Sequence, residues 1–208
     1  MKHLLLILLL PLTAIGQQPP TPVEAMFGNN RLVLQMSTNK AISKSGKFRF
    51  FNATITQADY KNTASETDII VNNALTYSLS KTLSVTSGVL LHYKLGMVPT
   101  AGIKFQKATP GFMILLFPML DFKPSLASEN LAMLEIKPSL GKTWRLYTRS
   151  QLLYIQNLKT GEHARSGYLV RAGLSHDQFS FGLGHNWDFY GPSRLLKANT
   201  GIFIQARL

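Results

Sequence analysis

The chain contains no cysteine among its 208 residues. Disulfide bonds and thiolate metal sites are therefore excluded as sources of stability or of chemistry. Long apolar runs are also missing after the first residues. The greasiest later segment, Gly111–Leu120, is far shorter than the ~20 residues of a transmembrane helix and is broken by Pro118. If this chain spans a membrane it must do so with strands, because only helices and closed barrels satisfy the backbone in lipid.

Acidic residues are scarce, with 10 Asp and Glu against 22 Lys and Arg. In a cytosolic protein this excess would suggest nucleic acid as a partner. The first residues argue otherwise, because residues 1–16, MKHLLLILLLPLTAIG, have the layout of a cleaved secretory signal peptide. We therefore expect an exported chain that begins at Gln17, with no nucleic acid partner. Outer-membrane lipid and lipopolysaccharide are the expected anionic partners, and a basic surface that is simply solvated is the alternative.

The stretch QFSFGLGHNWDFY, residues 178–190, alternates strictly between two kinds of residue. Phe179, Phe181, Leu183, Trp187 and Phe189 occupy every second place, and small or polar residues occupy the others. Such alternation places the two sets on opposite faces of a β-strand. A soluble sandwich would bury the apolar face in its core, whereas a membrane barrel would turn it outward to lipid.

Similar units of about ten residues follow one another from residue 31 to the end, separated by turn residues. Their apolar faces tend to finish in Tyr or Trp, as an interfacial girdle does, and shorter connections alternate with longer ones. The pattern predicts an all-β, antiparallel, up-and-down transmembrane β-barrel with short periplasmic turns and mostly longer outer loops. About ten strands are expected, near residues 47–57, 67–79, 83–94, 98–107, 110–122, 129–138, 143–156, 166–176, 178–189 and 197–208.

Two segments at the start of the mature chain leave the strand number open. Residues 17–30 are rich in proline and are expected to form an extended segment before a barrel of residues 31–208. The segment RLVLQMST, Arg31–Thr38, also reads as a strand. As an eleventh strand it would break the even number typical of such barrels, so it pairs at the seam, lies in the lumen or belongs to a twelve-strand barrel.

The phrases YSLSKTLSVTSGVLLHY and DFYGPSRLLKANTGIFIQARL are similar to segments of uncharacterised barrels of the Bacteroidota. Together with the signal peptide and the alternating strands, they make the chain resemble small bacterial outer-membrane β-barrel proteins. The resemblance implies the fold and a location in the outer membrane of a Gram-negative bacterium. It implies no activity.

The inward faces of the expected strands collect basic residues. A basic cluster is predicted in the lumen, consisting of Lys104, Lys137, Arg145, Arg149 and Arg171. One interpretation is a lumen filled by salt-bridged side chains, because a barrel of this size has little spare interior and buried charges need partners. The other is a narrow path or pocket for small anions, lined by Arg145, Arg149 and Arg171.

One expected strand is apolar on both faces. Phe112, Ile114, Leu116 and Leu120 share one face, and Met113, Leu115, Phe117 and Met119 share the other. One face would meet lipid. The second apolar face indicates either an apolar layer in the lumen, such as the Leu32–Met36 segment packed against it, or a strand on which a protein partner docks. The candidate docking residues are Phe112, Ile114, Leu116 and Leu120, and the partner would be a subunit of a larger envelope complex.

No catalytic, cofactor-binding or metal-binding motif is found. A membrane-embedded lipid hydrolase would need a Ser–His pair on the lipid-facing side, for which His185 and Ser193 are the nearest candidates. We therefore expect a non-enzymatic barrel that is a structural or accessory component of the cell envelope. A narrow pore or binding barrel for small anionic solutes is the alternative, and a lipid hydrolase is the third.

Overall fold

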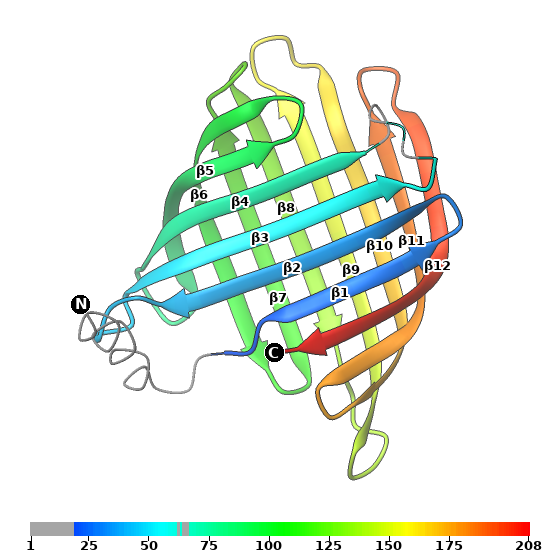
Figure 1. Cartoon of the computed structure of the whole chain (residues 1–208). Helices are drawn as coiled ribbons and strands as arrows, with labels where there is room; N and C mark the ends of the chain where they lie inside the picture. Colours follow the sequence, from blue (N-terminus) through cyan, green and yellow to red (C-terminus); the bar gives the residue numbers. More distant parts are fainter. Residues whose placement is uncertain (1–18, 62, 64–66) are drawn as a thin grey trace, which may run out of the picture.

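The computed structural model of the chain describes residues 19–61, 63 and 67–208, so the expected signal peptide lies outside the described residues. Twelve antiparallel strands close into one barrel, in which each strand pairs with its neighbour in sequence and β1 pairs with β12 (Figure 1). Among the described residues no helix is long and apolar enough to cross a membrane. The strands are β1 (Pro22–Gly28), β2 (Arg31–Ala41), β3 (Phe48–Asp59), β4 (Asp68–Ser78), β5 (Leu83–His92), β6 (Gly96–Thr109), β7 (Phe112–Asp121), β8 (Ala127–Ile136), β9 (Trp144–Asn157), β10 (His163–His176), β11 (Phe179–Tyr190) and β12 (Leu195–Arg207).

The strand number is twelve, the second of the two predicted values. Arg31–Thr38 is neither a seam segment nor a lumen plug but lies within strand β2. Its partner is Pro22–Gly28, which falls in the Pro-rich segment expected to precede the barrel and instead forms β1. The two prolines before β1 and the single proline at its start conceal a short strand, because proline is tolerated at the first position of a strand.

Alternation places one residue set on each side of the barrel wall, as predicted for residues 178–190. In β11 Phe179, Phe181 and Leu183 are exposed on the outside, whereas Asn186 and Asp188 are buried in the lumen. The same division holds in β12, where Ile202 and Ile204 are exposed and the residues between and after them are buried. The apolar face therefore points outward, which is the arrangement of a membrane barrel and not of a soluble sandwich.

Aromatic side chains gather on the outside near both ends of the strands. Trp144 packs edge-on against Phe181 at a centroid distance of 6.2 Å. Toward the other end of these strands Tyr168 stacks on Trp187 at 5.5 Å. One polar stripe interrupts the belt on β3 and β4, where the Asn52 amide donates to Asn73 Oδ1. Such paired aromatic rings at two heights are what two lipid–water interfaces favour.

We call the end where Pro22 pairs with Arg207 the terminus end, and the opposite end the far end. At the far end the connections are residues 29–30, 60–67, 93–95, 122–126, 158–162 and 191–194. At the terminus end they are residues 42–47, 79–82, 110–111, 137–143 and 177–178. Both ends carry short and longer connections, so the difference in loop length is smaller than the sequence pattern predicts. Several strands extend beyond their expected bounds into the predicted outer loops, which accounts for the change.

Candidate functional site

The lumen holds a buried carboxylate between two guanidinium groups. Glu24 Oε1 accepts hydrogen bonds from Arg149 Nη2 at 2.8 Å and from Arg171 Nε at 2.9 Å. The glutamate and Arg171 are each 2% exposed. Arg171 also donates through Nη1 to Asn186 Oδ1 at 2.7 Å. Buried charges are stable only when they are paired and hydrogen-bonded, and the charges of this group meet that condition.

A second carboxylate, that of Glu135, extends this group of paired charges toward the terminus end. Lys137 pairs with Glu135, and the Tyr147 hydroxyl lies 3.0 Å from Glu135 Oε2 and 3.0 Å from Gln205 Oε1. Tyr147 is fully buried and its ring packs 5.5 Å from that of Phe203. We call the set Glu24, Glu135, Lys137, Tyr147, Arg149, Arg171 and Gln205 the polar cluster.

A hydrogen bond between Gln35 and Gln151 crosses the lumen beside the polar cluster. We call this contact the Gln35–Gln151 chord. Gln35 Nε2, on β2, donates to Gln151 Oε1, on β9, at 3.1 Å. Arg149 Nη2 reaches the same Gln35 at 3.3 Å. Strands β2 and β9 are five places apart in the ring of twelve, so this contact crosses the lumen. The polar cluster fills the side enclosed by β8 to β12 and β1.

An ion-pair network spans the lumen near the far end. Arg165 donates through Nη1 to Asp68 Oδ2 at 2.7 Å and through Nη2 to Asp188 Oδ1 at 3.0 Å. Arg165 lies on β10 and Asp68 on β4, which are six places apart in a ring of twelve and therefore face each other across the full barrel. Gln57 links this network to Arg31 by accepting a hydrogen bond from Arg31 Nη1 at 2.7 Å.

The other half of the lumen is an apolar cavity of about 230 Å³. Its wall is built mainly by β2, β3, β7 and β8, with single residues or pairs from β4, β5, β6, β9 and β10. A buried apolar cluster lies along it, consisting of Phe51, Ala74, Leu115, Phe117 and Met119. The rings of Phe51 and Phe117 meet edge to face at 5.5 Å. Arg165 lines the cavity toward the far end, and the exposed Pro19 lines it where the chain enters the barrel. The cavity therefore runs along the barrel and reaches the terminus end.

The predicted basic cluster is divided by this arrangement. Lys137, Arg149 and Arg171 belong to the polar cluster and are held by two glutamates. Arg145 lies at the terminus end, with its nearest hydrogen bond a 3.5 Å contact to the Pro110 carbonyl. Lys104 is buried on the opposite wall, and its Nζ lies 4.6 Å from the centre of the Phe51 ring. Arg145, Arg149 and Arg171 thus do not form one continuous basic lining.

The strand that is apolar on both faces is β7, and both faces are accounted for. Leu116 and Leu120 are exposed on the outside, on the same face as Phe112 and Ile114. Leu115, Phe117 and Met119 point inward and line the apolar cavity. The apolar lumen layer is therefore present, and the two-faced pattern requires no protein partner to explain it.

Two residues that organise the lumen are not among the predicted site residues. Glu24 falls in the Pro-rich segment, and Arg165 falls in the expected loop between β9 and β10. Both obey the alternation of their strands. Glu24 and Met26 are buried between exposed or half-buried neighbours, and Arg165 shares the inward face of β10 with Arg171. Continuing the period of two one residue beyond the expected strand 166–176 would have identified Arg165, whereas Glu24 belongs to a strand that was not predicted.

The structure places a Ser–His pair where the sequence does not predict one. Ser166 Oγ lies 2.9 Å from His163 Nε2, and His163 Nδ1 lies 2.6 Å from the Gly191 carbonyl oxygen. Because that carbonyl only accepts, Nδ1 carries the proton in the neutral ring, and Nε2 accepts from the serine. The predicted His185 instead contacts Thr200 Oγ1 at 2.6 Å, and Ser193 lies in the connection between β11 and β12.

Metal binding finds no support in the part of the chain that is described. No group of three or more His, Asp or Glu side chains there is arranged to hold a metal ion.

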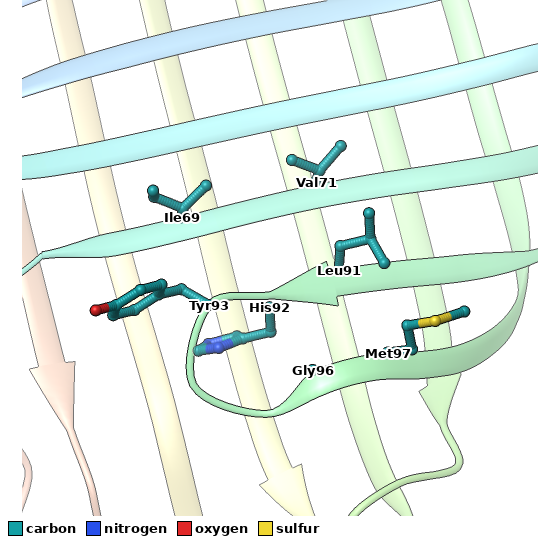
Figure 2. A pocket seen from close by; sticks show the side chains of 7 residues that line it. All are labelled: Ile69, Val71, Leu91, His92, Tyr93, Gly96 and Met97. Carbon is teal, nitrogen blue, oxygen red and sulfur yellow. The ribbon is translucent and has the colours of Figure 1, made fainter.

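A second hollow, of about 250 Å³, lies on the outside of β4, β5 and β6. Figure 2 shows Ile69, Val71, Leu91 and Met97 on neighbouring strands around it. Ile69, Leu91 and Met97 are exposed members of the outward apolar surface, so we assign this hollow to the surface that would face lipid.

No family model matches the chain, and no curated protein sequence matches it. The predicted resemblance to Bacteroidota barrels therefore stays a prediction. Solved outer-membrane barrels are similar in fold. The NanC porin is 12% identical with a TM-score of 0.49, covering 90% of this chain and 100% of its own. LpxR from Salmonella typhimurium is 7% identical with a TM-score of 0.43, covering 90% of this chain and 99% of its own. OccK9 from Pseudomonas aeruginosa is 11% identical with a TM-score of 0.42, covering 84% of this chain and 70% of its own. The similarity extends to the barrel architecture and to no activity.

Proposed function

We propose that this chain is a non-enzymatic outer-membrane barrel with a closed lumen, a structural or accessory component of the cell envelope. The observation that carries the proposal is the Arg165–Asp68 ion pair, which joins opposite walls of the barrel at 2.7 Å. An ion would have to break this buried pair to pass. The Gln35–Gln151 chord also crosses the lumen, and the polar cluster fills the space on one side of it, closer to the middle of the strands.

The location is part of the proposal. The outward apolar face and the aromatic side chains near both ends of the strands suit a bilayer, and the signal-peptide layout of residues 1–16 suits export. In that setting the terminus end faces the periplasm and the far end faces the cell exterior. Phospholipid and lipopolysaccharide are then the partners of the outer surface.

Ion conduction in planar bilayers tests the closed lumen. We expect the folded wild-type barrel to insert without stepwise current. Replacing Asp68, Arg165 and Asp188 together by alanine removes all three charges of the two ion pairs at once, and this variant is expected to pass more current than the wild type. The shift in gel mobility on boiling, typical of an intact barrel, serves as the folding control for both proteins.

The same recordings address the anion-path alternative. A wild-type barrel that conducts steadily, prefers anions and loses that preference when Arg149 and Arg171 are replaced by alanine would contradict the closed lumen. It would assign the polar cluster to a selectivity region. The present contacts favour the plug, because both guanidinium groups already share the Glu24 carboxylate.

A second candidate function, hydrolysis of a lipid ester, rests on the Ser166–His163 pair. A serine that donates to a histidine whose other nitrogen is held by an acceptor has the arrangement of an activated nucleophile. Ser166 alternates with the inward Arg165 and shares the outward face of β10 with the exposed Tyr168. The pair therefore lies on the lipid side near the far end, where a lipid ester would be presented.

A fluorophosphonate probe distinguishes the two candidates. A hydrolase is expected to be labelled at Ser166, with labelling lost in Ser166→Ala and strongly reduced in His163→Ala. Ser193→Ala is the matched control and should label like the wild type. Absence of labelling in the folded wild-type protein would contradict the hydrolase candidate. The Ser166–His163 pair would then only link the start of β10 to the 191–194 connection.

A protein partner on the outward face of β7 stays a prediction. Phe112, Ile114, Leu116 and Leu120 form an apolar strip there, but similar strips run along most of the barrel. A larger envelope complex would be recognised by stoichiometric co-purification in mild detergent.

A further inference from the structure

The apolar half of the lumen is larger than packing requires. Its volume is about 230 Å³, whereas a cavity of about 150 Å³ lined by Leu, Ile and Phe is enough to hold benzene in a protein interior. Apolar cavities with a few convergent polar groups are the usual form of small-molecule sites, and barrels often hold them in their mouths. The wall therefore suits a molecule with an alkyl or aromatic body.

The wall is also adaptable. Met113, Met119 and Met133 line the cavity from β7 and β8, beside the two aromatic rings of Phe51 and Phe117. Methionine is unbranched and polarizable, so it fills gaps of different shape and tolerates different occupants. A cavity of this composition suits a flexible chain better than a rigid molecule with fixed hydrogen-bonding groups.

Two basic groups contact lining residues of the cavity near the terminus end, although neither is itself a lining residue. Lys104 is 2% exposed, and its Nζ has no hydrogen-bond partner among the described residues. The ammonium group lies 4.6 Å from the ring of Phe51, which lines the cavity. Arg49 donates through Nε and Nη2 to the side chain and backbone of Asn39, another lining residue, at 3.0 and 2.6 Å. No carboxylate is paired with either cation in the described chain.

Acidic groups gather at the opposite end of the same cavity. Glu129 lines it near Arg165, and Asp68 and Asp188 already engage that arginine. Arg165 is therefore already matched by two carboxylates, whereas Lys104 and Arg49 near the terminus end have no acidic partner among the described residues. The distribution of charge sets the direction in which an amphipathic anion would lie.

We propose that the apolar cavity binds a single-chain amphipathic anion, a fatty-acid-like molecule whose acidic group is held by Lys104 and Arg49. Its alkyl body lies between Phe51, Phe117 and the methionines, and it enters from the terminus end beside Pro19. The acid supplies the missing counter-charge for a buried ammonium, and the chain covers apolar surface that is otherwise empty.

Binding of decanoate, compared with decanol of the same chain length, tests the proposal. Ligand occupancy is measured by native mass spectrometry of the refolded barrel released from maltoside micelles, at a pH where decanoate is ionised. Wild type is expected to bind decanoate at least about tenfold more tightly than decanol, because a charge-assisted hydrogen bond distinguishes them. Decyltrimethylammonium is expected to bind more weakly than either.

Two variants separate the charge from the cavity. Lys104→Met should reduce decanoate affinity to that of decanol, and it should fold, because it removes a buried charge that has no acidic partner. Ala53→Phe narrows the cavity from β3 and should weaken both ligands. Lys107→Met is the matched control, since it changes the same net charge on an exposed position of the same strand, and it should bind like the wild type.

Several results would overturn the proposal. Equal affinity for decanoate and decanol in the wild type, or unchanged decanoate binding in a folded Lys104→Met variant, would remove the role of the charge. Unchanged binding of both ligands in Ala53→Phe would place them outside the cavity. These outcomes are independent of conduction, so the closed lumen stands or falls on its own test.

Discussion

Glu24 shows how one residue can organise the lumen of a barrel. Its Oε1 accepts hydrogen bonds from both Arg149, on β9, and Arg171, on β10. These two strands are adjacent, and β11 and β12 lie between them and β1, which carries Glu24. The net stabilisation by such a buried pair is small, since the Coulombic gain largely offsets desolvation. Removing one partner is a different matter, because it leaves a charge buried and uncompensated.

Glu24→Gln should therefore destabilise the barrel by about 3–5 kcal/mol, as expected when a buried ion pair loses one partner. The amide retains the shape of the carboxylate but offers no charge to two guanidinium groups. The measurement is the midpoint of urea unfolding in lipid vesicles, compared with the wild type. Glu162→Gln, in the exposed 158–162 connection, is the control and should change stability by less than about 0.5 kcal/mol. Equal midpoints for both variants would show that the two arginines find other partners.

At the scale of the element, the backbones of β10 and β11 approach each other so closely at Gly173 and Gly182 that neither position has room for a side chain. Gly173 is paired with Gly182, and a Cβ built on Gly173 would lie 2.0 Å from the Phe181 carbonyl oxygen and 2.7 Å from the Gly182 Cα. These are backbone atoms and cannot move aside as a flexible side chain can. Glycine inside a strand often marks such a close approach of another backbone.

Gly173→Ala is thus expected to force the two strands apart and to cost about 1–3 kcal/mol or more, the usual range for overpacking. Folding yield in vesicles and the urea midpoint measure the effect. Gly111→Ala is the control, because a Cβ there meets only the Lys137 carbonyl oxygen at 3.5 Å, an ordinary contact. A Gly173→Ala barrel as stable as the Gly111→Ala barrel would mean that the ladder relaxes without loss.

At the scale of the whole molecule, closure depends on the strand that the sequence conceals best. β1 pairs with β2 on one side and with β12 on the other, so it joins the beginning of the barrel to its end. Without it β2 and β12 would each present an unpaired row of backbone groups, which a bilayer does not tolerate. The same strand carries Glu24, and closure of the wall and closure of the lumen therefore share one element.

Ten of the twelve strands were predictable within a few residues, because each has outward apolar residues at a period of two. The inward direction of Lys104, Lys137, Arg149 and Arg171 followed from the same period. β1 was not predicted because its segment is rich in proline. The first residues of β10, 163–165, were not predicted because the sequence before residue 166 is polar. Strand ends are the least visible part of such a pattern, since alternation fades where turn residues begin.

The amino-acid sequence by itself determined the class of fold, since alternation and the lack of long apolar runs leave strands as the only membrane-crossing form. It also determined which residues face inward within the strands that it revealed, because the period of a strand assigns every side chain to one face. Which inward residues meet was decided only by the tertiary structure. Arg165 and Asp68 are 97 positions apart and face each other because twelve strands place β4 opposite β10. The division of the lumen into a polar half and an apolar cavity has the same origin, because strand number and register set the pairs of residues that lie across the barrel.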